Sequence, residues 1–364
     1  MRKLLFNFHL YGALIVGLFV VTIGVTGAIM AFEDDLDRLS NPQFFHVQAG
    51  ATPMPVADLF RAAETAVPGQ KINNLRLPQS ATDTVMFRLP GSKQAFLNPY
   101  TGQLLGTRSG NTNLQTIHTI HQRLMMGKPG ETVVTAVTGV LLLLVSSGLY
   151  LWWPLKRVSI KWSASARRIH FDLHNVAGIF SAAFLLVLGI TGIVVHFDND
   201  VEKYLHTKWG TKPIPRTAPS VVQAGGKRIT PDQAIESAQA ALPGTKALTV
   251  GIPGGPKGSY VVGLRYPEDL TPGGRSWASV DQFSGQVNSL QSSRTAPAAS
   301  RAIIVNRATH TGDLFGYPSK ILVSLSSMML VIQAITGYYL WWKKLRSKQA
   351  RESVKRETVD ETLV

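Results

Sequence analysis

Apolar residues gather in four long blocks that polar sequence separates. The blocks cover residues 10–32, 132–153, 176–197 and 321–342, and none contains a charged side chain. Each is close to the ~20 residues that an α-helix needs to cross about 30 Å of hydrocarbon. The pattern predicts an integral membrane α-helical protein with a four-helix transmembrane bundle.

The polar segments define the remaining domain boundaries. Residues 33–131 and 198–320 form two long inserts, the first ending in an interfacial helix, whereas residues 154–175 form a short loop. The first span, with its short N-terminus, occupies residues 1–32, and a tail of residues 343–364 follows the fourth span. The expected topology is two helical hairpins, each enclosing a large extramembrane insert.

Positive charge concentrates in the short segments beside the spans. The chain carries a formal net charge of +15, of which residues 1–9, 154–173 and 343–364 account for +9 and the much longer remainder for +6. Because short loops rich in Lys and Arg stay on the cytoplasmic side, we expect both termini inside and both inserts outside. The charge thus reflects helix insertion, and no nucleic-acid partner is expected.

Internal repeats indicate that both halves descend from one span–insert–span unit. A shift of 165 residues lays the first span on the third and His9 on His174, and a shift of 189 residues lays the second on the fourth and His121 on His310. The first span is expected to be retained, since it is longer than a usual signal core and lacks a clear cleavage site.

Each insert has the pattern of a small α+β module. Amphipathic helices are predicted at residues 55–67 and 230–242, each ended by Pro-Gly. Alternating segments at residues 84–89 and 259–266 predict the strands that follow.

Histidines carry the chemical signal of the sequence. Seven of the nine border the spans in two layers. They are His9, His170 and His174 at the inner ends, and His118, His121, His196 and His310 at the outer ends. A histidine at such a boundary can simply hydrogen-bond a backbone carbonyl, yet ionisable groups within spans are functional candidates because their burial is costly.

Opposed histidines on different helices of a bundle can supply both axial ligands of a haem iron. The repeat favours His9 with His174 in the inner layer and His121 with His310 in the outer layer. The expected cofactor is therefore haem, one in each layer and two per chain. The chain has no Cys, which excludes thiolate zinc sites, iron–sulfur clusters and thioether-attached haem.

Other histidines remain alternatives in each layer. His196 is a substitute for either outer ligand, His170 could replace His174, and His118 is a weaker outer candidate. Glycines along the spans are typical of close helix packing and equally leave room for a flat macrocycle.

Two motifs resemble those of a known family. The run at residues 120–130, IHQRLMMGKPG, leads into SGLYLWWP at residues 147–154. Together they resemble the signature of PepSY-associated transmembrane helix proteins, and residues 230–242 and 278–286 resemble PepSY modules. In the second copy, Thr311-Gly312 stands where the first has Gln122-Arg123 after the histidine, so that half departs from the family's pattern.

The resemblance implies a ferric-siderophore reductase of the bacterial inner membrane, of the ferrioxamine reductase kind, with b-type haem held between the helices. It assigns the ligand role to His9, His174, His121 and His310, with His196 also matching a membrane position.

The expected function follows from this arrangement. Electrons from a cytoplasmic or quinol donor would cross the lipid membrane through both haems and reduce a ferric siderophore in the periplasm. The inserts would form the docking surface. The aromatic candidates there are Tyr100, Trp209, Trp277 and Phe283. Two alternatives remain: a haem-free PepSY regulator of periplasmic proteolysis, and a cytochrome subunit that passes electrons to a protein partner.

Overall fold

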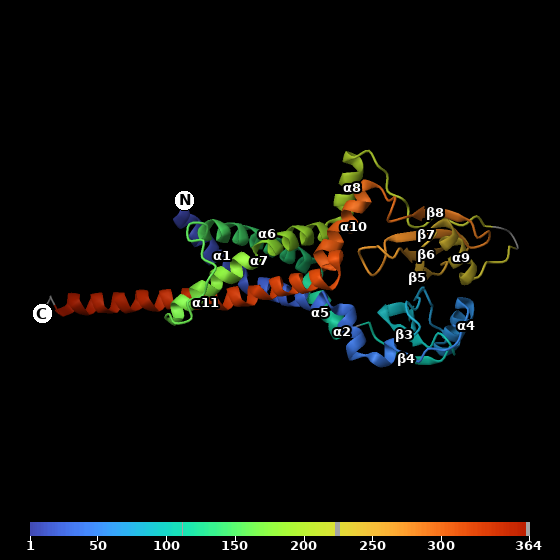
Figure 1. The fold of residues 1–364 in the computed structure, drawn as a ribbon, viewed down its shortest axis with the longest axis horizontal. Helices are drawn as coiled ribbons and strands as arrows, with labels where there is room; N and C mark the ends of the chain where they lie inside the picture. Colours follow the sequence, from blue (N-terminus) through green and yellow to red (C-terminus); the bar gives the residue numbers. More distant parts are fainter. Residues whose placement is uncertain (111, 223–225, 362–364) are drawn as a thin grey trace.

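The computed structural model describes residues 1–110, 112–222 and 226–361, which form a helix bundle and a sheet-containing head (Figure 1). The bundle consists of α1 (Arg2–Met30), α6 (Lys128–Trp152), α7 (Ala166–His196) and α11 (Tyr317–Glu361). Each of these helices is long and apolar enough to cross a membrane. Below, the end of the bundle beside the head is called the sheet end, and the opposite end the tail end.

The four long helices pack in a ring. Helix α1 contacts α6 and α11, and α7 contacts the same two helices. Helices that correspond in the duplication therefore lie diagonally opposite, α1 facing α7 and α6 facing α11. The buried centre of the bundle is apolar, with side chains from all four helices. They are Val16, Val20, Val137, Leu144, Leu185 and Leu330.

The long helices extend beyond the apolar blocks that predicted them. Helix α7 begins at Ala166 rather than at residue 176, and α11 continues beyond residue 342 through the predicted tail. Hydropathy marks the part that lipid covers, whereas the helix itself persists through Arg, Lys and Glu because these residues favour helical backbone. Residues 362–364 of the predicted tail lie outside the described residues.

Short helices connect the bundle with the head. They are α2 (Glu33–Ser40), α3 (Pro42–Phe45), α5 (Asn113–Arg123), α8 (Asp198–Lys208) and α10 (Ala298–Thr311), with the 3₁₀ turn η2 (Asp313–Phe315). A further 3₁₀ turn, η1 (Pro90–Ser92), joins two strands within the head. Helix α5, the predicted interfacial helix, packs against α1 and α6, and α10 packs against α7 and α8. These two helices bring the ends of both inserts back to the bundle.

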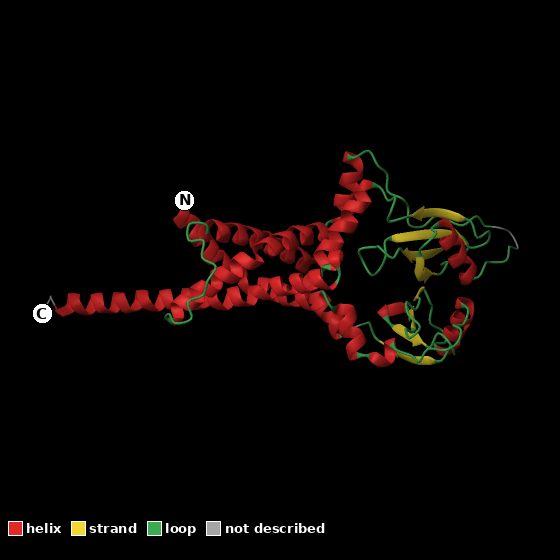
Figure 2. Ribbon diagram, viewed as in Figure 1, coloured by secondary structure: helices red, strands yellow, loops and turns green. Residues whose placement is uncertain are grey.

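The head contains one sheet covered by two helices, α4 (Val56–Ala66) and α9 (Pro231–Ala241) (Figure 2). The first insert contributes β1 (Asn74–Arg76), β2 (Val85–Arg88), β3 (Gln94–Leu97) and β4 (Leu104–Arg108). The second contributes β5 (Lys246–Gly251), β6 (Ser259–Arg265), β7 (Ser276–Asp281) and β8 (Val287–Gln291). The strand order is β4-β3-β2-β1-β5-β6-β7-β8, so the two predicted modules share one continuous sheet rather than standing apart.

The junction of the two modules lies on a local twofold axis. Strands β1 and β5 pair antiparallel, with Leu75 opposite Val250 and Arg76 opposite Thr249. A shift of 175 residues in the sequence lays Leu75 on Val250, so β1 and β5 are equivalent strands of the two inserts. These two equivalent strands pair with one another. Both residues are fully buried in a single apolar core beneath α4 and α9. This pairing satisfies the backbone N–H and C=O groups that each module would otherwise expose at the edge of its sheet.

A carboxylate reinforces this junction. Asp232 in the first turn of α9 accepts hydrogen bonds from the backbone N–H groups of Val56 and Ala57, at 2.7 and 2.9 Å. These are the first residues of α4, whose N-terminus has no side-chain cap of its own. One module therefore caps the helix of the other.

Replacing Asp232 by Ala should destabilise the head by about 1–2 kcal/mol, the usual cost of losing an N-terminal cap. The measurement is the denaturant midpoint of the head's unfolding, followed by near-ultraviolet circular dichroism of the full chain. Glu236→Ala is the matched control, because Glu236 is an exposed acid on the same helix. Equal midpoints for the two variants would contradict the capping role.

Candidate functional site

Two histidines face one another at the tail end of the bundle. His9 lies on α1 and His174 on α7, the diagonal pair of helices, and their ring centroids are 6.3 Å apart. Their planes are nearly perpendicular, at 85°. The structure thus places together the two inner residues that the sequence repeat relates.

A second pair lies at the sheet end. His121 near the end of α5 and His310 near the end of α10 have ring centroids 6.4 Å apart and planes inclined by 46°. These two residues are also related by the repeat. The protein therefore carries two layers of paired histidines, one at each end of the bundle.

In the inner pair, each Nδ1 atom is held by a neighbouring helix. His9 Nδ1 lies 3.1 Å from both the Leu144 carbonyl oxygen and Ser147 Oγ on α6. His174 Nδ1 lies 3.2 Å from the Gln333 carbonyl oxygen and 3.0 Å from Thr336 Oγ1 on α11. In both cases the carbonyl precedes the hydroxyl by three residues.

The outer pair repeats this arrangement. His121 Nδ1 lies 2.9 Å from the Ile23 carbonyl oxygen on α1, and 3.2 Å from Thr26 Oγ1. His310 Nδ1 lies 3.2 Å from the carbonyl oxygen of Leu188 on α7 and 3.2 Å from the hydroxyl of the residue three positions later, Thr191. All four rings are thus fixed by the same carbonyl-plus-hydroxyl anchor.

The anchors determine which nitrogen of each ring carries the proton. A carbonyl can only accept, and the hydroxyls of Thr26, Thr191 and Thr336 donate to carbonyls of their own helices at 2.6–2.7 Å. Ser147 likewise donates to Leu144 at 3.0 Å. Nδ1 must therefore be the donor, and Nε2 of the neutral ring keeps its lone pair. Metal-ligating histidines use this same outer-shell bond to fix tautomer and orientation.

Burial also favours the neutral form in the outer pair, whose helices α5 and α10 are outside the four spans. Burial lowers the pKa of His121. Burial, together with the neighbouring His121, lowers the pKa of His310 to about 4. Both rings are therefore neutral at physiological pH, the form in which imidazole binds a metal.

A glycine follows each anchoring hydroxyl and makes room for the ring. A Cβ atom on Gly27 or Gly192 would lie 2.9 Å from Cε1 of the outer histidine beside it, and one on Gly148 would lie 3.1 Å from Cε1 of His9. At Gly337 the corresponding distance to His174 is 3.5 Å. A side chain at the two outer glycines would displace the ring.

The spacing of the rings fits two ligands on one metal ion. A metal-bound imidazole nitrogen lies about 2.0 Å from the metal and the ring centre about 1.2 Å further, which puts opposed ring centroids roughly 6.4 Å apart. Among the described residues, no three His, Asp or Glu side chains gather as a metal-binding group. The ring spacing of each pair is also that of two histidine ligands on one haem iron.

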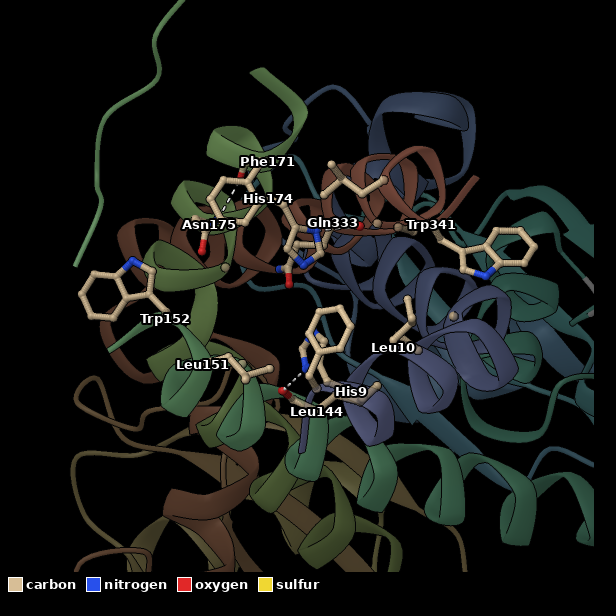
Figure 3. Close-up of a pocket in the computed structure, with 18 of the residues that line it drawn as sticks. His9, Leu10, Leu144, Leu151, Trp152, Phe171, His174, Asn175, Gln333 and Trp341 are labelled. Carbon is tan, nitrogen blue, oxygen red and sulfur yellow. Dashed lines mark hydrogen bonds between the residues drawn. The ribbon is translucent and has the colours of Figure 1, made fainter. Parts of the chain in front are cut away.

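The inner pair borders a cavity of about 940 Å³ between the four long helices. Figure 3 shows His9 and His174 reaching it from different helices, with Trp152 and Trp341 at its sides. The volume is at the upper end of the roughly 300–1,000 Å³ range of ligand pockets. Most of the lining is apolar, and five basic residues line it from the tail end. They are Arg2, Lys3, Arg167, Arg168 and Lys344.

The alternative histidines have other contacts. His170 stacks on Tyr339 with ring centroids 3.8 Å apart, and His118 Nδ1 lies 3.4 Å from a Glu33 carboxylate oxygen. The ring of His196 packs edge-on against its neighbour Phe197. None of the three shares the anchor of the paired rings.

The structure also gives positions for the predicted docking aromatics. Tyr100 donates a hydrogen bond to the Ala81 carbonyl at 2.7 Å, and Trp277 is buried in the sheet, so both are structural. Phe283 is half-buried beside the turn after β7, and Trp209 is half-exposed after α8.

The four anchoring hydroxyls are residues that the sequence patterns did not single out for function. Their signal is present in every span as a Ser or Thr directly before a Gly. The dipeptides are Thr26-Gly27, Ser147-Gly148, Thr191-Gly192 and Thr336-Gly337.

In a comparison with known families, the sequence model of the PepSY-associated TM region matches residues 6–344 of this chain. No curated protein matches the chain.

Gly192→Ala should destabilise the protein by about 1–3 kcal/mol, because the new methyl group overlaps the fixed ring of His310. Gly139→Ala is the control on α6, where a Cβ meets no atom within 4 Å, and it should leave stability unchanged or raise it. Thermal midpoints in detergent measure both. A Gly192→Ala protein as stable as the control would refute the close contact.

Proposed function

Since the chain belongs to the PepSY-associated TM region family, we propose that it is a haem-containing membrane oxidoreductase that reduces ferric iron bound to siderophores. The observation that carries this proposal is the two layers of facing, identically anchored histidines. Such layers at both ends of one bundle suit electron transfer along its axis.

Each pair would hold one haem b. His9 and His174 would be the ligands of one group, and His121 and His310 those of the other. Bound haem supplies a one-electron couple between ferric and ferrous iron. The chain's own residues fix each Nε2 lone pair, and apolar side chains form most of the cavity beside the inner pair. The basic residues around the inner cavity offer positive charge to the carboxylates of its occupant.

The expected orientation puts the tail end in the cytoplasm and the head in the periplasm of a bacterial inner membrane. The positive charge of the short connecting segments supports it. Electrons from a cytoplasmic reductant or a membrane quinol would then enter at the inner pair and leave at the outer pair.

The substrate would be a ferric siderophore at the head. One electron converts its ferric ion to ferrous, while the donor loses one electron. Ferrous iron has a lower charge and binds hard oxygen donors less strongly, so the metal is released for uptake. This outer-sphere step needs no acid or base from the protein, whose role is ligation, orientation and docking.

Removing one inner ligand should remove half of the haem. In the purified protein expressed with ample haem, His9→Ala should halve the Soret absorbance per chain and leave the spectrum of the outer haem unchanged. His170→Ala is the control, since that ring lies outside both pairs, and should retain all haem. Loss of both haems from a folded His9→Ala protein would contradict two independent layers.

The same preparation separates the other functions. A native protein without any Soret band would favour the haem-free regulator of proteolysis. A dithionite-reduced protein that remains reduced when ferric siderophore is added anaerobically would favour a cytochrome subunit with a protein acceptor.

The absence of Cys permits a direct test of orientation. Ser347→Cys on the extension of α11 and Ser80→Cys on the head both replace exposed residues. In intact spheroplasts, a membrane-impermeant maleimide should label position 80 at once and position 347 only after lysis. The opposite pattern would reverse the proposed direction of electron flow.

A further inference from the structure

One face of the continuous sheet is turned toward the bundle. Helices α4 and α9 cover the other face, and Figure 1 shows them on the side of the sheet away from the bundle. Arg108 on the bundle-facing side forms a two-bond ion pair with Asp37 of α2, at 2.6 and 2.7 Å. The sheet therefore presents this face to the end of the bundle that holds His121 and His310.

Arginines from both inserts lie on this face. Arg88 pairs with Asn74 in the register of β1 and β2, so Arg76 and Arg88 are diagonal neighbours on one side of the sheet. Such neighbours have Cα atoms roughly 7–8 Å apart. Arg76 is opposite Thr249 of β5, and Thr249 is opposite Gly263 of β6, so these three residues share one side of the sheet. Arg265 lies two residues after Gly263 on β6 and is therefore on that same side. Arg275 directly precedes β7.

These four arginines are here called the arginine face. Among the described residues, none of the four side chains forms a hydrogen bond or an ion pair. The Nε atoms of Arg265 and Arg275 are buried, as is the hydroxyl of Thr271 in the hairpin between them, and all three lack a partner. Thr271 is only 5% exposed. Buried donors without acceptors are rare and costly, which indicates a ligand.

The acidic residues nearby are committed elsewhere or outnumbered. A cavity of about 230 Å³ lies between the sheet, α2 and the start of α5. Its charged lining comprises Arg38, Arg76, Arg88, Arg108, Glu33, Asp34 and Asp37. Asp37 is paired with Arg108, and Glu33 lies beside His118. In the second module, burial and the positive charges of Arg307 and Arg216 lower the pKa of Arg275, against opposing contributions from Asp198 and Asp313.

We propose that the arginine face binds the negatively charged oxygen atoms of a ferric chelate, so that the substrates of this protein are anionic siderophores of the catecholate or carboxylate type. This inference rests on the proposed reductase function and specifies its substrate class. The planar guanidinium forms paired hydrogen bonds with such oxygen atoms. Because the 230 Å³ cavity is smaller than a whole chelate, only part of the chelate enters it, beside Arg76 and Arg88.

The position suits electron transfer from the outer pair. Arg307, whose charge acts on Arg275, is three residues before His310 on α10. Gln115 of the small cavity lies on α5, the helix that carries His121. A chelate on the arginine face is therefore at the sheet end of both helices that hold the outer ligands.

Binding can be tested without any redox reaction, because gallium(III) forms chelates of the same charge and shape as iron(III) and is not reduced. The full-length haem-loaded protein in lipid-free dodecyl maltoside is equilibrated with a triply negative gallium tris-catecholate or an uncharged gallium trihydroxamate. We expect the anionic chelate to bind more tightly, with an affinity that falls as salt rises. Two double variants remove the arginines in pairs: Arg76→Gln with Arg88→Gln, and Arg265→Gln with Arg275→Gln. Each should weaken the affinity for the anionic chelate by about tenfold or more.

Matched variants exclude general effects of charge or folding. Arg61→Gln removes an exposed arginine of α4, beneath the opposite face of the sheet, and should bind like the native protein. Arg76→Lys/Arg88→Lys retains charge without the guanidinium fork and should bind with intermediate affinity. An unchanged Soret band and thermal midpoint verify that each variant is folded.

Three results would overturn the inference. They are equal affinity for the charged and uncharged chelates, native affinity in either glutamine double variant, and exclusive occupancy of the face by phosphatidylglycerol when that lipid is added. A separate anaerobic assay of ferric tris-catecholate with the reduced protein tests the reductase proposal. Arginine-dependent gallium binding without iron reduction would reject the reductase and retain the anion site.

Discussion

The structure depends on satisfying a polar N–H group within an apolar bundle. A buried imidazole must donate its one proton to an acceptor, and few acceptors exist among membrane helices apart from carbonyls and hydroxyls. Each paired histidine meets this requirement by bonding a different helix from its own. His9 on α1 bonds α6, and His174 on α7 bonds α11. These bonds between helices are thus the ones that fix Nε2 as the unprotonated nitrogen.

The two layers depend on different parts of the chain. The inner ligands lie directly on the long helices, so the bundle alone determines their spacing. The outer ligands lie on α5 and α10, which are the last helices of the two inserts before the chain returns to the bundle. The two inserts join through Leu75 and Val250 in one sheet, and Asp232 caps a helix of the opposite insert. The head and the outer pair therefore share one local twofold arrangement.

The sequence was sufficient to predict the spans and the histidine pairs because both leave strong patterns. Four uncharged blocks have few interpretations other than membrane helices, and the repeat relates His9 with His174 and His121 with His310 directly. The continuous sheet was not predictable, since β1 has only three residues, too few for an alternating pattern to show. Its pairing with β5 also joins residues far apart in the chain, which local propensity does not record. The anchoring hydroxyls were missed because a Ser or Thr before Gly in a span also suits plain helix packing.

The two ends of the molecule are both basic, for different physical reasons. At the tail end, Lys and Arg occupy the short segments beside the spans, as the expected orientation of the helices requires, and they also line the inner cavity. At the sheet end, the arginine face is unpaired and lies on a folded surface, where insertion places no demand on charge. On the proposed function, this charge acts twice. It attracts an anionic ferric chelate to the outer pair, and it repels the ferrous cation once the chelate has released it. The same arginines would then favour both docking of the substrate and departure of the metal.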